Sequence, residues 1–201
     1  MTIPTTPTST HQKHQIVADF LNEIDPKIVW DIGANNGAFS RIAVKQGCST
    51  VAFDIDGSAV EANYLNAVEQ KETKMLPLVL DVLNPTPAIG WGLRERYSVL
   101  ERGNPDCIMA LALIHHLAIS GNVPLGHIAQ LLASLSPNLI IEFVPKEDSQ
   151  VQKLLQSRED IFPYYTAVEF KDAFSNYFNI NSIRKIGQSS REIYLMRRKD
   201  K

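Results

Sequence analysis

The sequence predicts an α/β fold built around a parallel sheet. Five continuous apolar runs recur along the chain, at residues 27–33, 49–56, 75–82, 106–113 and 138–144. Such runs are typical of strands that are buried on both faces. Their starts lie about 22 to 32 residues apart, and the intervals between them carry helical periodicity. This is the spacing of repeated right-handed βαβ units.

Helices are expected ahead of the first strand and between the strands. Over residues 11–24 the apolar side chains fall on one helical stripe, which Asp25-Pro26 ends. Capping-box patterns at 58–61 and 166–169 predict two more helix starts. A further apolar stripe predicts a helix over 125–135.

The end of the chain is expected to form a hairpin. Residues 178–187 and 191–199 have strand character and flank the short polar turn 188–190. A hairpin joins antiparallel strands, so the sheet is expected to end with an antiparallel strand.

Composition indicates one domain, over residues 11–201. The chain has 201 residues, of which 44% are hydrophobic and 21% charged, as in an average globular protein. Residues 1–10 are rich in Thr and Pro and are expected to form a disordered leader or a linker. A larger parent protein with an additional upstream domain is therefore possible.

Charge and hydropathy disfavour nucleic-acid and membrane partners. The formal net charge is -2, so no global positive field would draw the chain to nucleic acid or anionic lipid. The apolar run 107–113 is far shorter than the about 20 residues that cross a bilayer. Cys48 and Cys107 each lie in or beside an apolar run, which indicates buried thiols in a reducing compartment. We therefore expect a cytoplasmic protein without a membrane partner, and a nucleic-acid partner is disfavoured but not excluded.

The turn after the first strand is the expected ligand loop, because open parallel sheets bind ligands beyond the carboxyl ends of their strands. The dinucleotide fingerprint would place glycines at 33, 35 and 38, where the chain has Gly33, Asn35 and Ala38. The Gly-Lys pair of a Walker loop is also missing here. The loop sequence therefore disfavours a nicotinamide-dependent oxidoreductase and any ligand that is held mainly by its phosphate groups.

The motif Asp31-x-Gly33-x-Asn35-x-Gly37 resembles the first motif of class I S-adenosylmethionine-dependent methyltransferases. The chain departs from that motif at the middle glycine. Asn tolerates a left-handed backbone, so we predict a positive or bridging φ at Asn35. The resemblance implies a Rossmann-like, three-layer αβα fold. The resemblance also implies a sheet of seven strands in the order 3-2-1-4-5-7-6, mostly parallel with one antiparallel strand.

The resemblance implies S-adenosylmethionine as cofactor and S-adenosylhomocysteine as product. Such a ligand needs close backbone approach and a carboxylate for its ribose diol. Asp54, which lies 21 residues after Gly33, has the spacing of a ribose-binding acid, whereas Asp56 is expected to start the next helix. The resemblance places Asp81 and Val82 at the adenine. The full expected cofactor set is Asp31, Gly33, Ala34, Asn35, Asn36, Gly37, Asp54, Ile55, Asp81, Val82, Ala110 and Leu111.

Three residues are candidates for the chemistry. His115 and His116 follow the fourth strand, and imidazole titrates near neutral pH, so either is a possible base, or a structural histidine that packs at the sheet edge. Adjacent residues point in different directions, so the two cannot share one role. Glu142 interrupts the apolar fifth strand, which indicates either an acceptor-binding residue or base, or a structural ion pair. No metal site is expected, because only the distant His127 follows the pair.

A narrower resemblance covers most of residues 12–198. The segments "ALALIHHLAIS", "IEFVPKEDSQVQ" and "SREDIFPYYT" look like a group related to nodulation-associated methyltransferases. The Asn-Pro-Pro-Tyr motif of enzymes that methylate bases or glutamine is absent. The resemblance therefore implies methyl transfer to an unidentified small molecule by in-line displacement. The alternative is a non-catalytic S-adenosylmethionine-binding module of a larger protein.

Residues after the fifth strand are possible rim residues. Lys146 and Asp148 lie just past that strand. Tyr164 and Tyr165, with the charged residues 158–160, are placed where a lid or acceptor wall could form. The alternative is a polar loop with aromatic packing.

Overall fold

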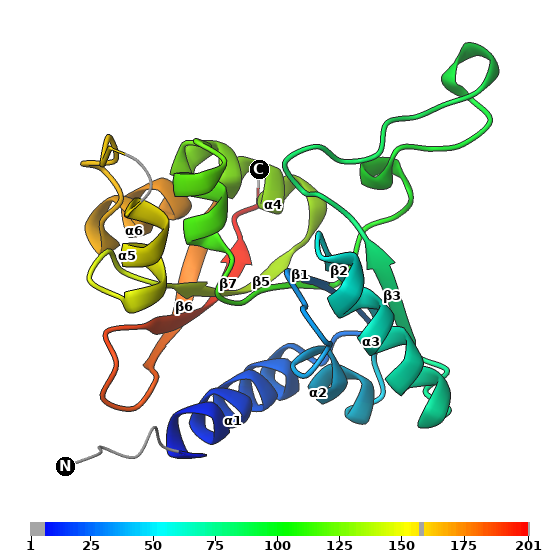
Figure 1. The fold of residues 1–201 in the computed structure, drawn as a ribbon, viewed down its shortest axis with the longest axis horizontal. Helices are drawn as coiled ribbons and strands as arrows, with labels where there is room; N and C mark the ends of the chain where they lie inside the picture. The colour runs from blue at the N-terminus through cyan, green and yellow to red at the C-terminus, as the bar shows by residue number, and fades with distance from the viewer. Residues whose placement is uncertain (1–6, 157–158, 201) are drawn as a thin grey trace.

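A computed structural model describes residues 7–156 and 159–200 (Figure 1). Seven strands form one sheet in the predicted order β3-β2-β1-β4-β5-β7-β6. β1 to β5 pair in parallel, and β7 runs antiparallel to both β5 and β6. The strands are β1 (Ile28–Ile32), β2 (Ser49–Asp54), β3 (Met75–Val79), β4 (Cys107–Ala110), β5 (Asn138–Phe143), β6 (Phe178–Lys185) and β7 (Glu192–Arg198). The predicted parallel sheet and terminal hairpin are confirmed.

Helices cover both faces of the sheet, which gives the predicted three layers (Figure 1). One face carries α1 (Pro7–Ile24), α2 (Ser40–Lys45) and α3 (Gly57–Glu69). The other carries α4 (Leu125–Leu135), α5 (Ser149–Leu155) and α6 (Ala167–Ser175), together with a π-helical turn over His116–Ser120.

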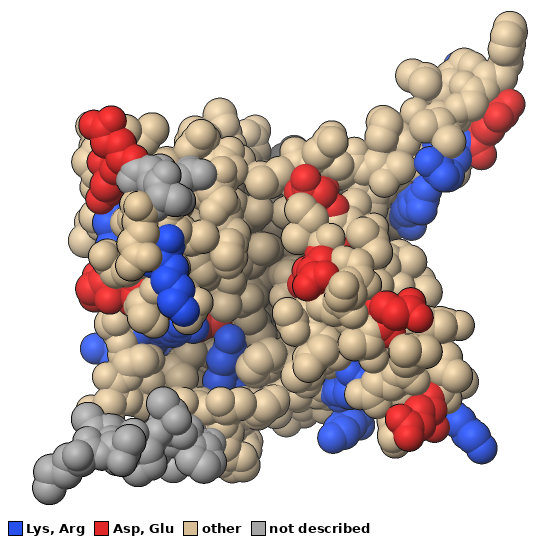
Figure 2. Space-filling model, viewed as in Figure 1, with Lys and Arg blue, Asp and Glu red and all other residues tan. Residues whose placement is uncertain are grey.

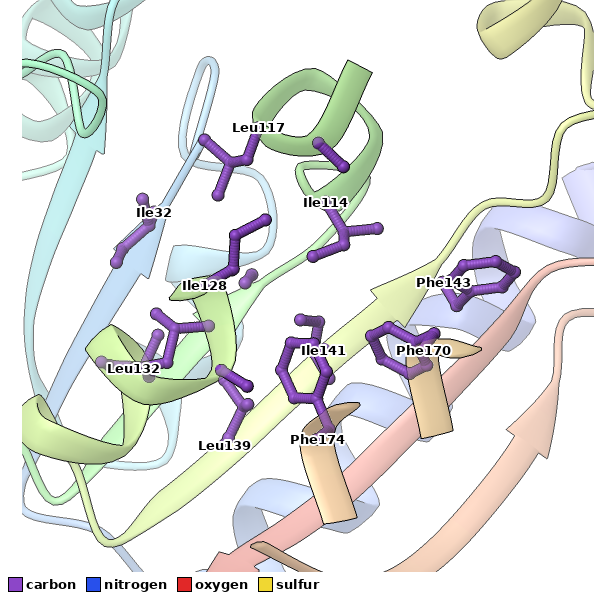
Figure 3. Packing of buried hydrophobic residues seen from close by; sticks show 14 of the residues in the cluster. Ile32, Ile114, Leu117, Ile128, Leu132, Leu139, Ile141, Phe143, Phe170 and Phe174 are labelled. Atoms are coloured by element: carbon purple, nitrogen blue, oxygen red, sulfur yellow. The ribbon is translucent and has the colours of Figure 1, made fainter. Parts of the chain in front are cut away.

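The main hydrophobic core lies between the sheet and the second set of helices. In Figure 3, Leu139 and Ile141 of β5 face Leu132 of α4 and Phe174 of α6. Neighbours along a strand point to opposite faces. Residue 140 therefore packs with α1 in a separate cluster, and residue 142 lies on that same face.

Two helix starts differ from the prediction. α1 begins at Pro7, so residues 7–10 are helical, whereas residues 1–6 of the expected leader lie outside the described residues. α3 begins after Asp56, whose side chain accepts a hydrogen bond from the backbone N–H of Ser58. The prediction that Asp56 starts this helix is confirmed, whereas the capping box predicted at Ser58 is wrong, because the Asp56 carboxylate takes the capping role. Thr166 caps α6 as predicted, accepting from the N–H of Glu169.

The connection from β3 to β4 contains no α-helix, so the prediction of a complete βαβ unit is wrong there. Residues 80–106 carry two short 3₁₀ turns, Trp91–Leu93 and Val99–Glu101, and an isolated β-bridge between Ile89 and Arg96. The part around Trp91–Leu93 projects away from the body of the protein (Figures 1 and 2), whereas Val99 is buried in the main core. Prolines 85 and 87 and glycines 90 and 92 interrupt any helix here. Trp91 is 89% exposed on this projection.

Among the described residues, no helix has both the length and the apolar character needed to cross a membrane. Cys48 and Cys107 are free, buried thiols. In the same part of the chain, no group of three His, Cys, Asp or Glu side chains is arranged to hold a metal ion.

Candidate functional site

The loop after β1 is bound to the end of β2 by backbone hydrogen bonds. The carbonyl oxygen of Phe53 accepts from the N–H groups of Gly33 and Ala34, both at 2.9 Å. The N–H of Asn35 donates to Oδ2 of Asp54 at 2.6 Å. Asn35 has a φ of 50°, as predicted, so the turn forms without a middle glycine.

Gly37 is required by close packing against α3. It has a φ of 76°, and a Cβ there would lie 2.4 Å from Oδ1 of Asn63. The same Oδ1 accepts a hydrogen bond from Arg41 at 2.9 Å, and Arg41 also donates to the carbonyl of Asn36. These contacts fix the far side of the loop.

A cavity of about 500 Å³, which we name the large cavity, lies at the carboxyl ends of β1 to β4. This volume suits a small-molecule ligand. Asp54 lines it from the end of β2, and Asp81 lines it from the segment after β3. His116 and Ser120 approach from the π-helical turn. None of the described residues that line it is Lys or Arg.

A smaller cavity of about 230 Å³ adjoins the large one on the other side of the loop. Gly33, Asn35, Leu111 and Ala112 line both. Asp31, at the end of β1, and Lys13, from α1, line only this small cavity.

The two cavities bring together most of the predicted cofactor residues. Those that line one or both are Asp31, Gly33, Ala34, Asn35, Asn36, Asp54, Ile55, Asp81, Val82 and Leu111. Gly37 lines neither, because it packs against Asn63, and Ala110 is buried in β4. The sequence analysis missed Lys13, because one lysine on an amphipathic helix forms no motif.

The two adjacent histidines have different environments. His116 lines the large cavity, whereas His115 is only 2% exposed, and its Nδ1 has no hydrogen-bond partner among the described residues. Burial lowers the pKa of His115 to about 3. Burial also lowers the pKa of His116, although the nearby Asp54 opposes this shift. Both imidazoles are therefore neutral at physiological pH.

Glu142 lies in a buried ion-pair network and itself lines neither cavity. Its carboxylate, which is fully buried, pairs with Lys13 at 2.6 Å and with Arg191 at 3.4 Å. Arg191 also binds both carboxylate oxygens of Asp148, at 2.7 and 2.8 Å. Lys146 pairs with the Asp160 carboxylate at 2.8 Å. The geometry therefore matches the structural alternative for Glu142.

Asp31 is a buried carboxylate with one strong donor. It is 1% exposed and accepts a hydrogen bond from Oγ of Ser40 at 2.6 Å. Burial raises its pKa to about 6, although the Ser40 hydroxyl and the charge of Lys13 both act in the opposite direction. A carboxylate whose pKa is shifted by burial and which lines a cavity is typical of functional sites.

Replacing Asp31 by Asn is expected to stabilise the fold at neutral pH. The folded-state pKa lies above the unfolded value, so the folded protein loses stability as the pH rises from about 4 to about 6. Above that window the full cost, at most about 3 kcal/mol, remains. Denaturant unfolding of Asp31→Asn and of the unsubstituted chain, at pH 7.5 and at pH 4.5, measures the difference in their free energies of unfolding. The gain is expected to be larger at pH 7.5.

Ser40→Ala is the matched control, because it removes the donor and leaves the carboxylate. It is expected to lower stability at pH 7.5. A gain for Asp31→Asn that does not depend on pH would contradict the assignment of the buried charge.

Comparisons with known proteins identify the family of this chain. A family model described as a methyltransferase domain matches residues 10–189. Nodulation protein NoeA of Rhizobium meliloti (strain 1021) is 39% identical over 196 residues, which is 97% of this chain and 41% of that protein. The chain thus spans about two fifths of the length of this curated relative.

Solved structures share the fold. N-methyltransferase NodS from Bradyrhizobium japonicum WM9 superposes with a TM-score of 0.70 at 12% identity, over 98% of this chain and all of that chain. Magnesium protoporphyrin IX methyltransferase (ChlM) from Synechocystis PCC 6803 with bound SAH gives 0.65 at 18% identity, over 95% of this chain and 84% of that chain. The chain therefore belongs to the methyltransferase domain family, with the fold of its class I, S-adenosylmethionine-dependent members.

Proposed function

We propose that this chain binds S-adenosylmethionine across the two adjoining cavities and transfers its methyl group to a small-molecule acceptor. The observation that carries the proposal is the meeting of Asp54, Asp81 and the loop after β1 around one cavity. Carboxylates suit a ribose diol and an exocyclic amine. The absence of Lys and Arg from the described lining residues disfavours a pyrophosphate.

The large cavity fits the adenosine part. Asp54 would accept hydrogen bonds from the ribose hydroxyls, with Ile55 beside it. Asp81 would accept from the adenine amine, and Val82 supplies an apolar wall. These roles match the chemistry of each side chain at the end of its strand.

The small cavity fits the amino-acid end. That end carries an ammonium and a carboxylate, and the cavity presents Asp31 and Lys13. An ammonium beside Asp31 would favour the ionised carboxylate and offset part of the cost of its burial. Lys13 is fixed by Glu142, so Glu142 acts here as a positioning residue.

His116 is the residue best placed to take a proton from the acceptor. When bound, S-adenosylmethionine supplies an electrophilic methyl group, whose bond to sulfur breaks as the acceptor's lone pair forms the new bond. His116 lines the large cavity and is neutral, so its imidazole has a free lone pair for the proton. The apolar walls, among them Leu113 and Leu117, exclude water and align the acceptor.

The proposal places the chain in the cytoplasm. Its cysteines, Cys48 and Cys107, are both free thiols in the structure, as is usual in a reducing compartment.

Asp54→Ala is expected to weaken S-adenosylhomocysteine binding by about 10- to 100-fold, since hydrogen bonds to a charged group are lost. Isothermal titration calorimetry measures the affinity. Asp56→Ala is the matched control, because Asp56 caps α3 without lining the large cavity. It is expected to cost about 1 kcal/mol of stability and to leave the affinity unchanged. Tight NAD binding without a response to S-adenosylhomocysteine would overturn the proposal.

His116→Gln is expected to spare S-adenosylhomocysteine affinity and to lower kcat by about 10²- to 10⁴-fold if the acceptor arrives protonated. A labelled-methyl screen of small-molecule acceptors provides the assay. His115→Gln is the comparison, because His115 does not line the large cavity. Equal kcat values for His116→Gln and the unsubstituted chain would contradict the role of His116. Binding of the cofactor with no turnover of any acceptor would favour the non-catalytic module.

A further inference from the structure

A third cavity, of about 350 Å³, lies where the start of α4 meets α6 and the loop 161–165. Gly126 lines it from α4, Glu169 and Ala173 from α6, and Tyr164 from the loop. None of these residues takes part in the site described above.

The third cavity shares a wall with the large cavity. Within the π-helical turn, His116, Leu117 and Ser120 line the large cavity, whereas Ala118 lines the third. A helix with its side chains is about 10 Å across. A molecule that reaches from one cavity to the other therefore has to be elongated.

The lining of the third cavity is aromatic and acidic. Phe162, Tyr164 and Tyr165 contribute rings. The hydroxyl of Tyr165 donates to the carbonyl of Val144 at 2.8 Å, so this tyrosine is held in place by its polar end. Tyr164 is 72% exposed at the rim. Aromatic rings attract organic cations through their faces.

Glu169 is the charged residue among the described residues that line this cavity, and none of them is Lys or Arg. Its backbone N–H donates to Oγ1 of Thr166 at 3.2 Å, and its carboxylate takes no part in that hydrogen bond. The lining therefore favours a positive charge and repels an anion.

We propose that the third cavity holds the end of the methyl acceptor remote from the reacting atom, and that this end is an apolar or aromatic group bearing an ammonium. This inference rests on the proposed function, because it takes the large cavity as the place of methyl transfer. It defines the acceptor as an elongated organic cation that crosses the π-helical turn.

Three probes of one skeleton test the chemistry by calorimetry on the unsubstituted chain. They are 3-phenylpropylamine, which is a cation at pH 7.5, 3-phenylpropan-1-ol, which is neutral, and 3-phenylpropanoate, which is an anion. The amine is expected to bind about fivefold more tightly than the alcohol, and the anion most weakly. An amine that binds no more tightly than the alcohol would overturn the assignment.

Gly126→Leu tests the location. Gly126 lines the cavity, and a Cβ there has nothing within 4 Å, so we expect a larger side chain at this position to fill part of the cavity. It is expected to abolish amine binding without lowering the free energy of unfolding. Gly57→Leu is the matched control, since Gly57 starts α3, also has open space at its Cβ and lines none of the three cavities. Amine binding that survives Gly126→Leu would place the probe elsewhere and overturn the proposal.

Glu169→Gln tests the charge and is expected to remove the preference for the amine over the alcohol. Asp172→Asn removes a charge from the same helix outside the cavity and is expected to keep the preference. An unchanged preference in Glu169→Gln would contradict the role of the carboxylate.

S-adenosylhomocysteine affinity, measured on the same variants, separates the two proposals. Gly126→Leu and Glu169→Gln are expected to bind it as the unsubstituted chain does. If the unsubstituted chain binds the amine but no S-adenosylhomocysteine, the proposed function fails, and with it the role of this cavity in holding an acceptor. If S-adenosylhomocysteine binds but the amine does not, only the inference about the third cavity fails.

Discussion

The candidate site depends on the hydrogen bonds that join the loop after β1 to the end of β2. The carbonyl oxygen of Phe53 accepts hydrogen bonds from the N–H groups of two successive loop residues, and the Asp54 carboxylate accepts one from the N–H of the next residue. β1 and β2 lie side by side in parallel register, so both strand ends arrive at the same edge. These hydrogen bonds fix the conformation of the loop, and the loop forms a wall that the large and small cavities share. Asp54 both holds the loop and faces the large cavity.

Two buried carboxylates, Glu142 of β5 and Asp31 of β1, lie in different electrostatic environments. Glu142 has two cationic partners, whereas Asp31 has one hydroxyl donor and a raised pKa. Lys13 connects them, because it pairs with Glu142 and also lines the small cavity with Asp31. A positive ligand group near Asp31 would offset part of the cost of burying this carboxylate. The N-terminal helix therefore contributes to the candidate site as well as to the core.

Local patterns in the sequence predicted the strands of the sheet, and most of the residues predicted for the cofactor line the two adjoining cavities. The buried strands and the terminal hairpin are visible in the sequence itself, whereas their order, which was correct, followed from the family resemblance. The left-handed Asn35 was predictable from its place in a glycine motif. The conformation of residues 80–106 was not predictable, because Pro and Gly residues disfavour a helix there but do not specify which structure forms in its place. The environments of His115 and Glu142 depend on distant elements, which no local spacing reveals.

The central claim is that the ends of β1 to β4 hold S-adenosylmethionine, and a crystal structure with bound S-adenosylhomocysteine tests it most directly. The account predicts the ribose hydroxyls on the Asp54 carboxylate and the adenine between Asp81 and Val82. It predicts the amino-acid end beside Lys13 and Asp31. A ligand bound outside the two adjoining cavities, or a ribose without contact to Asp54, would contradict the account.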